Sequence, residues 1–110
     1  MQKNDRIRVQ HMLDAAEEII LFTDGKTRDS LNDNRMLLLS VVKNLEIIGE
    51  AATKVTEETR RELQEIPWPE ITSMRNRLIH GYFDIDVDIV WSTIQIDLGP
   101  LRELLKKALA

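Results

Sequence analysis

Glycine and proline are scarce in this chain, and their placement constrains the fold more than any other feature. The 110 residues include four glycines and three prolines, which leave long segments without a helix breaker. Within these segments, apolar residues recur every three or four positions rather than in alternation, which is typical of amphipathic helices. The sequence therefore predicts an all-α fold, an antiparallel bundle of four to five helices with no sheet.

The expected helices follow from these apolar stripes and from the residues that begin and end helices. The first helix is expected over residues 4–23, before the break at TDGKT. The second is expected from about residue 31 to the middle fifties, with Ser30 as its N-cap and TEETRREL as a further turn or two. The third is expected over residues 69–80, because IPWPE stops the second and Gly81 favours a helix end.

The last helix is expected after the connector YFDID, with Asp84 or Asp86 as its N-cap. Pro100 predicts a kink within that helix. Gly49 lies inside the second helix, where glycine costs stability relative to alanine. It therefore indicates a close approach of another helix, within the chain or across a dimer.

Length and composition bound the class of protein. The chain fits a single domain over residues 1–110, with 43% hydrophobic residues and no cysteine, and the absence of cysteine favours a reducing compartment. The N-terminus is too polar for a signal peptide, and no apolar run is long enough to span a membrane. We therefore expect a cytoplasmic protein. A net charge of -4 argues against a broad cationic surface, so any contact with nucleic acid must be local.

The stretch MRNRLIHGYFDID, residues 74–86, places Arg75, Asn76 and His80 in an otherwise amphipathic helix. On one continuous helix, Asn76 and His80 would lie within about 40° of each other, and Arg75 roughly 140° from His80. The residues alone leave two interpretations open. One is a solvated helix end, with His80 near the negative end of the helix dipole. The other is a phosphate site, since arginine binds phosphate oxygens and imidazole transfers protons near neutral pH.

Other polar and aromatic residues favour structural roles. The DIDVD segment, residues 84–88, lacks the glycine and distal glutamate of a calcium loop, and helix capping explains it. His11 has no second ligand at metal-binding spacing. Trp68 and Trp91 are interpreted as core or interface anchors rather than stacking platforms for bases. We therefore expect no metal and no other cofactor.

Two stretches, NLEIIGEAATKV and IPWPEITSMRNRLIHGYFDID, resemble the HepT family of HEPN-domain toxins, and the likeness spans nearly the whole chain. That family is marked by an arginine, a polar residue that is usually asparagine, a histidine a few residues later and a tyrosine two positions beyond it. Arg75, Asn76, His80 and Tyr82 match this motif position by position. The resemblance implies a HEPN-like helical domain that acts as a homodimer.

The resemblance also implies a function. The chain would be the toxin of a toxin-antitoxin system, a metal-independent endoribonuclease that uses Arg75, His80 and Asn76 at a homodimer cleft. Its cognate antitoxin would be a nucleotidyltransferase of the MntA type, which inactivates the toxin by transferring AMP to Tyr82. RNA would be the substrate.

The chemistry of RNA cleavage agrees with a dimer. Cleavage through the 2′-hydroxyl needs a base and an acid, yet each chain offers a single well-placed histidine. An isologous interface through the third expected helix, residues 69–80, would bring two copies of the site together. Arg75 and Arg77 would supply the local positive charge. Two alternatives stay open: a catalytically silent helical subunit that binds a nucleotidyltransferase, and a purely structural helical dimer.

Overall fold

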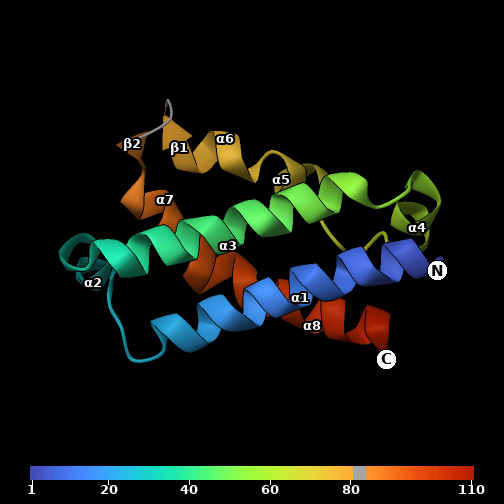
Figure 1. The fold of residues 1–110 in the computed structure, drawn as a ribbon, viewed down its shortest axis with the longest axis horizontal. Coiled ribbons are helices and arrows are strands. Elements are labelled where there is room, and N and C mark those ends of the chain that lie inside the picture. The colour runs from blue at the N-terminus through green and yellow to red at the C-terminus, as the bar shows by residue number, and fades with distance from the viewer. Residues whose placement is uncertain (81–83) are drawn as a thin grey trace.

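A computed structural model describes residues 1–80 and 84–110, and these residues are mostly helical (Figure 1). In chain order, the elements are α1 (Lys3–Thr23), α2 (Arg28–Asp33), α3 (Arg35–Lys54), α4 (Glu57–Glu62), α5 (Trp68–Thr72), α6 (Met74–Leu78), β1 (Ile79–His80), β2 (Asp84–Ile85), α7 (Val87–Ser92), a π-helical turn (Thr93–Asp97) and α8 (Leu98–Leu109). The prediction of an all-α fold is confirmed. The expectation of no sheet misses one antiparallel pair of two-residue strands.

Helix α1 packs against both α3 and α8, and α3 lies between α1 and the α5–α6 pair (Figure 1). The direction of α3 follows from two contacts with α1. Near the start of α1, Asp5 bonds to Thr56, just beyond the end of α3. Nearer the end of α1, Glu18 accepts a hydrogen bond from Asn44 within α3. The two helices are therefore antiparallel, as predicted for the bundle.

The apolar stripes read from the sequence form the core. Burial of each Val, Leu, Ile or Met side chain contributes about 1.5–3 kcal/mol, so these stripes supply most of the stabilisation of the fold. The buried residues of the three long helical segments include Val9, Met12, Leu13, Ala16, Ile19, Leu38, Val41, Val42, Leu45, Ile48, Ala51, Ala52, Val90, Ile94, Leu98, Leu101 and Leu105. Ile20, which continues the apolar stripe of α1 beyond Ile19, is only half-buried.

A buried carboxylate ties the start of α1 to the start of α4. Asp5 is 1% exposed and accepts hydrogen bonds from the Thr56 backbone N–H at 3.0 Å and from the hydroxyls of Thr56 and Thr59, each at 2.5 Å. Burial alone would raise the pKa of Asp5. The hydrogen bonds from Thr56 and Thr59 outweigh burial and hold the pKa below its ordinary value of 3.8.

We expect Asp5→Ala to lower the free energy of unfolding by about 3 kcal/mol, because three donors lose a charged acceptor. Since the pKa of Asp5 is lower in the folded than in the unfolded chain, this stabilisation is complete above about pH 4 and is lost as the pH falls through the folded-state pKa. Urea unfolding of wild type and variant at neutral and acidic pH measures both effects. A difference in stability that does not shrink in acid would contradict this role for Asp5.

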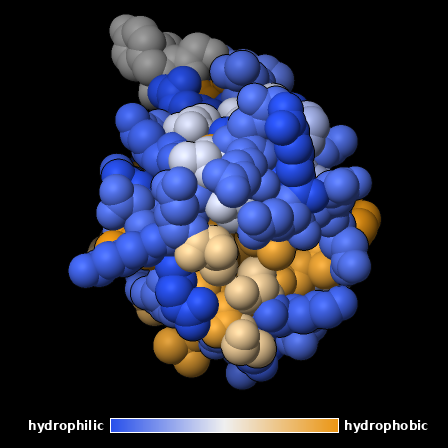
Figure 2. Space-filling model, turned by 90° about the vertical axis from the view of Figure 1, so that its right-hand side faces the viewer, coloured by the Kyte–Doolittle hydropathy of each residue, from blue (hydrophilic) through white to orange (hydrophobic). Residues whose placement is uncertain are grey.

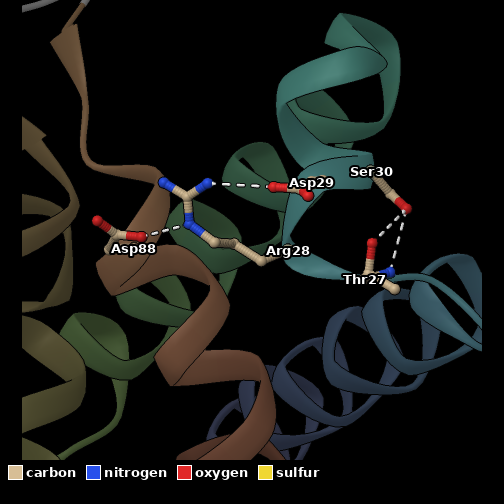
Figure 3. Close-up of polar contacts among 5 residues, drawn as sticks. All are labelled: Thr27, Arg28, Asp29, Ser30 and Asp88. Atoms are coloured by element: carbon tan, nitrogen blue, oxygen red, sulfur yellow. Dashed lines mark hydrogen bonds and ion pairs between the residues drawn. The ribbon is translucent and has the colours of Figure 1, made fainter.

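The second predicted helix is divided into α2 and α3. Asn34 breaks it with an extended backbone, and its side chain accepts the Leu37 N–H at 3.0 Å, which caps α3. The prediction of Ser30 as an N-cap is wrong, because Thr27 takes that position and Ser30 lies inside α2. The Ser30 hydroxyl instead reaches back to accept the Thr27 backbone N–H at 3.1 Å (Figure 3). The turns expected from TEETRREL are present as α4.

The third predicted helix, over residues 69–80, is interrupted twice. Ser73 separates α5 from α6 with a backbone ψ of 1°. Helix α6 then ends at Leu78, because Ile79 adopts an extended conformation with φ -124° and ψ 122°. Ile79 and His80 pair with β2 instead, an arrangement that suits a β-branched residue. The prediction that the helix continues to His80 is wrong.

Gly49 permits a close approach between α3 and α5. A Cβ atom at this position would lie 3.2 Å from the backbone oxygen of Ile71, which is tighter than ordinary van der Waals contact. The close approach predicted for Gly49 is confirmed, and it occurs within the chain. It holds α5, and with it α6, against α3.

The final helical segment begins as predicted but contains an irregular turn. Asp86 accepts the Ile89 N–H at 3.1 Å and caps α7, so one of the two predicted caps is confirmed. Pro100 lies in the first turn of α8, where a missing N–H is tolerated. The helix is irregular just before α8, where Thr93–Asp97 form a π-helical turn.

Trp68 anchors α5 in the core. It is 6% exposed, its indole N–H donates to the Leu63 oxygen at 3.1 Å, and the Arg60 guanidinium lies 5.7 Å from its ring centroid. Trp91 is half-buried against the core. The structural interpretation of both tryptophans is confirmed.

The surface at the end of the molecule that carries α4 and both termini is mostly hydrophilic, with a hydrophobic patch (Figure 2). Among the described helices, none is both long enough and apolar enough to cross a membrane.

Candidate active site

Helix α6 presents Arg75 and Asn76 on the surface. Met74 and Leu78, at 4% and 0% exposure, anchor the helix in the core, so the residues between them face outward. Arg75 and Asn76 are both exposed. Within the described part of the chain, neither side chain has a hydrogen bond or ion pair, so both can contact a ligand.

Arg75 and Arg77 lie on opposite sides of α6. Arg75 lines a groove of about 620 Å³ that α1, α3, α5 and α6 border. Arg77 lines a second pocket against α8, and its guanidinium donates to the backbone carbonyl oxygen of Glu70 at 3.1 Å. Within one chain, Arg75 and Arg77 therefore do not share a site, because residues two apart on a helix point roughly 160° apart.

His80 lies beside the carboxylate of Asp86, a residue for which the sequence predicted only a helix-capping role. The distance from His80 Nε2 to Asp86 Oδ2 is 3.3 Å. The His80 side chain is 57% exposed and that of Asp86 28%, so a ligand can reach the imidazole. The hydrogen bond from the Ile89 N–H, and then the one from His80, lower the pKa of Asp86 below its usual range. Asp86 therefore stays a carboxylate that can orient His80.

The start of α7, which carries Asp86, is held from a second direction by α2. The guanidinium of Arg28 donates to Asp88 in the first turn of α7, and its Nη1 lies 3.5 Å from Asp29 (Figure 3). The hydrogen bond to Asp88 is the main cause that raises the pKa of Arg28. The carboxylate beside His80 thus sits on an anchored helix end.

The strand conformation of His80 corrects the predicted geometry of the site. Because His80 is not on α6, the expected separation of about 40° between Asn76 and His80 on one helix face does not apply. The structure joins His80 to Asp86 by a direct contact and leaves Arg75 and Asn76 on the neighbouring helix. Tyr82 lies outside the described residues.

The described residues contain no group of three or more histidine, cysteine or acidic side chains that could hold a metal ion. Within the DIDVD segment, Asp86 caps α7 and Asp88 pairs with Arg28. The capping explanation of these carboxylates is confirmed for Asp86. His11 is exposed on α1 and lines the same groove as Arg75.

Sequence reasoning missed two features of the site. The contact between Asp86 and His80 depends on the pairing of β1 with β2, although an acidic residue shortly after a histidine was a usable signal. The gathering of Arg8, Lys43 and Lys54 around the groove of Arg75 had no signal in the sequence. These residues come from two helices whose pairing is a tertiary property.

The fold and the site together define a class: a small all-helical protein whose exposed arginine and carboxylate-bound histidine suit chemistry on a phosphodiester. Residues 12–108 match the family model described as Ribonuclease HepT-like. The chain belongs to the HepT-like ribonuclease family. It is thus a member of a family of RNA-cleaving enzymes, and RNA is the substrate class of that family.

Several curated proteins are similar over most of this chain. The "Probable ribonuclease HepT" of Thermococcus cleftensis is 32% identical over 97% of each chain. "Putative RNase TTE0752" of Caldanaerobacter subterraneus is 34% identical over 97% of this chain and 96% of its own. A Methanocaldococcus jannaschii protein named "Gamma-glutamylcyclotransferase and putative RNase MJ0434" is 35% identical, but this chain spans only 48% of it. No solved structure was found to match.

Proposed function

We propose that the chain is a metal-independent endoribonuclease and the toxin of a toxin-antitoxin system, with His80, Arg75 and Asn76 as its catalytic residues. The observation that carries the proposal is the contact between His80 and Asp86 beside the exposed helix of Arg75 and Asn76. Family membership supplies RNA as the substrate, and these side chains supply proton transfer and charge stabilisation.

The proposed reaction uses the 2′-hydroxyl of the RNA as nucleophile. A base removes its proton, the 2′-oxygen forms a bond to phosphorus, and the bond from phosphorus to the 5′-oxygen breaks as an acid protonates the leaving oxygen. The products are a 2′,3′-cyclic phosphate and a free 5′-hydroxyl. His80 transfers protons, Arg75 stabilises the negative charge that develops on the phosphoryl oxygens, and Asn76 orients the phosphate.

Asp86 gives His80 a defined orientation. A carboxylate that accepts from Nε2–H favours the tautomer in which Nδ1 carries the free lone pair. Nδ1 is then the atom that faces the substrate. Because Asp86 is held at the start of α7, the imidazole is oriented before RNA binds.

The proposal includes a homodimer, because base and acid must act in one cleft. An apolar part of the α3 surface supports it: Met36 is 81% exposed and Leu39 is 44% exposed. A second copy of the chain would cover these side chains and bring a second His80 to the site. One histidine then acts as base and the other as acid.

The mechanism predicts cleavage in the presence of EDTA, because no step uses a metal ion. We expect purified protein in EDTA to cut a single-stranded RNA and to leave cyclic phosphate and 5′-hydroxyl ends, which mass spectrometry of the fragments identifies. Activity that disappears in EDTA and returns with magnesium would overturn the mechanism. Binding of a nucleotidyltransferase without any cleavage would favour the silent binding subunit instead.

Regulation by the antitoxin is proposed at Tyr82. The residue follows His80 by two positions in the sequence, and the resemblance to HepT marks its phenol as the acceptor of AMP from a nucleotidyltransferase of the MntA type. Attached phosphate would repel the RNA backbone and compete for Arg75.

After co-expression with the antitoxin, we expect AMP-sized mass additions that map to Tyr82. Tyr82→Phe should carry no such addition and should keep its ribonuclease activity. Additions at another residue would remove Tyr82 from the mechanism.

A further inference from the structure

The groove that contains Arg75 extends well beyond the proposed catalytic residues. Its lining residues come from α1, α3, α5 and α6, and α3 lies between α1 and the α5–α6 pair (Figure 1). Four basic residues line it: Arg8 from α1, Lys43 and Lys54 from α3, and Arg75 from α6. Basic residues therefore reach the groove from three helices.

Acidic residues only partly offset this charge. Glu46 and Glu50 also line the groove, and Glu50 lies 3.9 Å from Lys54. Arg8 and Lys43 form no hydrogen bond or ion pair with other residues that the structure describes. The four basic residues against two acidic ones reverse the balance of the whole chain, which has 15 basic and 19 acidic residues.

The exposed stripe of α3 changes character along the helix. Met36 and Lys43 are seven residues apart and therefore share one face of the helix. The stripe is apolar at Met36 and Leu39 and mostly charged from Lys43 to Lys54, where the exposed Ile47 interrupts it. The apolar end fits a second copy of the chain, whereas the charged half is poorly suited to such an interface because charged residues are depleted in interface cores. The charged half of the stripe therefore suits a ligand other than a second copy of the chain.

We propose that the charged half of this groove binds the sugar-phosphate backbone of single-stranded RNA as the strand continues from the phosphate at Arg75. This inference rests on the proposed function, which places the cleaved phosphate at Arg75. Lys43, Lys54 and Arg8 then contact phosphates of the flanking nucleotides. Among the described residues that line the groove there is no Phe, Tyr or Trp, so the groove binds the backbone and offers no stacking platform for bases.

The test removes three charges from the groove and, in a matched control, three charges from elsewhere. The groove variant carries Arg8→Gln, Lys43→Gln and Lys54→Gln. The control carries Lys26→Gln, Lys106→Gln and Lys107→Gln, which changes the net charge by the same amount. Both are made in the His80→Ala background, and fluorescence anisotropy in EDTA measures the binding of a labelled oligouridylate at several salt concentrations.

We expect the groove variant to bind the oligouridylate about tenfold more weakly, and its salt dependence to flatten by about 2 in the slope of log K against log salt, since each phosphate contact contributes about 0.7. The control should bind like the parent. Equal losses in both variants, or an unchanged groove variant, would overturn the proposal. Dissociation of the dimer in the groove variant, measured by sedimentation, would overturn it in favour of a protein interface.

A second substrate separates this inference from the proposed function. With His80 restored, the groove variant should cut the dinucleotide uridylyl-adenosine at the wild-type rate, because this substrate has one phosphate and reaches only the catalytic residues. If wild-type protein cuts neither the dinucleotide nor longer RNA, the proposed function fails, and the anisotropy measurement still decides the groove.

Discussion

The His80→Ala variant should cleave RNA about 10³-fold more slowly than wild type, within the range of 10² to 10⁴ that positioned proton transfer contributes. The loss should appear in kcat, because His80 acts on the reacting protons rather than on substrate binding. The fold should be unaffected. His80 is exposed at the end of β1, and substitutions at such positions change stability by about 0.5 kcal/mol or less.

Mixing experiments test whether two histidines act in one cleft. If wild-type and His80→Ala chains are refolded together in equal amounts, random pairing leaves about a quarter of the dimers with two wild-type chains. Activity near a quarter of the wild-type value is expected if both histidines are needed. Activity near one half would show that each protomer acts alone and would contradict the shared cleft.

Much of the fold could be predicted because it depends on local periodicity. The stripes of α1, α3 and the last helix were readable from apolar residues at helical spacing, and nearly all of them are buried. The close approach at Gly49 was readable from the cost of a glycine inside a helix. These features need no knowledge of which helix packs against which.

The errors arise where tertiary contacts override local propensity. Residues 69–80 carry a helical pattern, yet Ile79 and His80 leave the helix to pair with Asp84 and Ile85. The backbone groups of these residues have two ways to form hydrogen bonds, and the sequence does not reveal which is more stable.

The residues of the site also differ in how far the local sequence predicts them. Arg75, Asn76 and His80 were found because the motif is local, whereas the contact of Asp86 with His80 depends on the pairing of β1 with β2. Its sequence position indicated a helix cap, which is confirmed. Its second oxygen, 3.3 Å from His80 Nε2, could be located only in three dimensions.

The Arg75→Ala variant should lose about 10² to 10³-fold in the rate of RNA cleavage, which is typical when a group that stabilises transition-state charge is removed. Arg75 is exposed and has no bond to another described side chain, so the loss should reflect the missing guanidinium rather than a disturbed fold. Arg75→Lys should recover only part of the rate, because a lysine cannot contact two phosphoryl oxygens in the geometry of a guanidinium.

Arg77→Ala is the matched control for this prediction. It removes the same side chain two residues away on the same helix, but from the pocket against α8, where Arg77 donates to the Glu70 oxygen. Cleavage of the dinucleotide uridylyl-adenosine by each purified variant makes the comparison, since this substrate does not depend on the rest of the groove. Equal losses in the two variants would show that α6 contributes general positive charge. A loss confined to Arg75→Ala would place the phosphate on the side of α6 that faces α3, because Arg75 lies on that side and Arg77 lies on the opposite side.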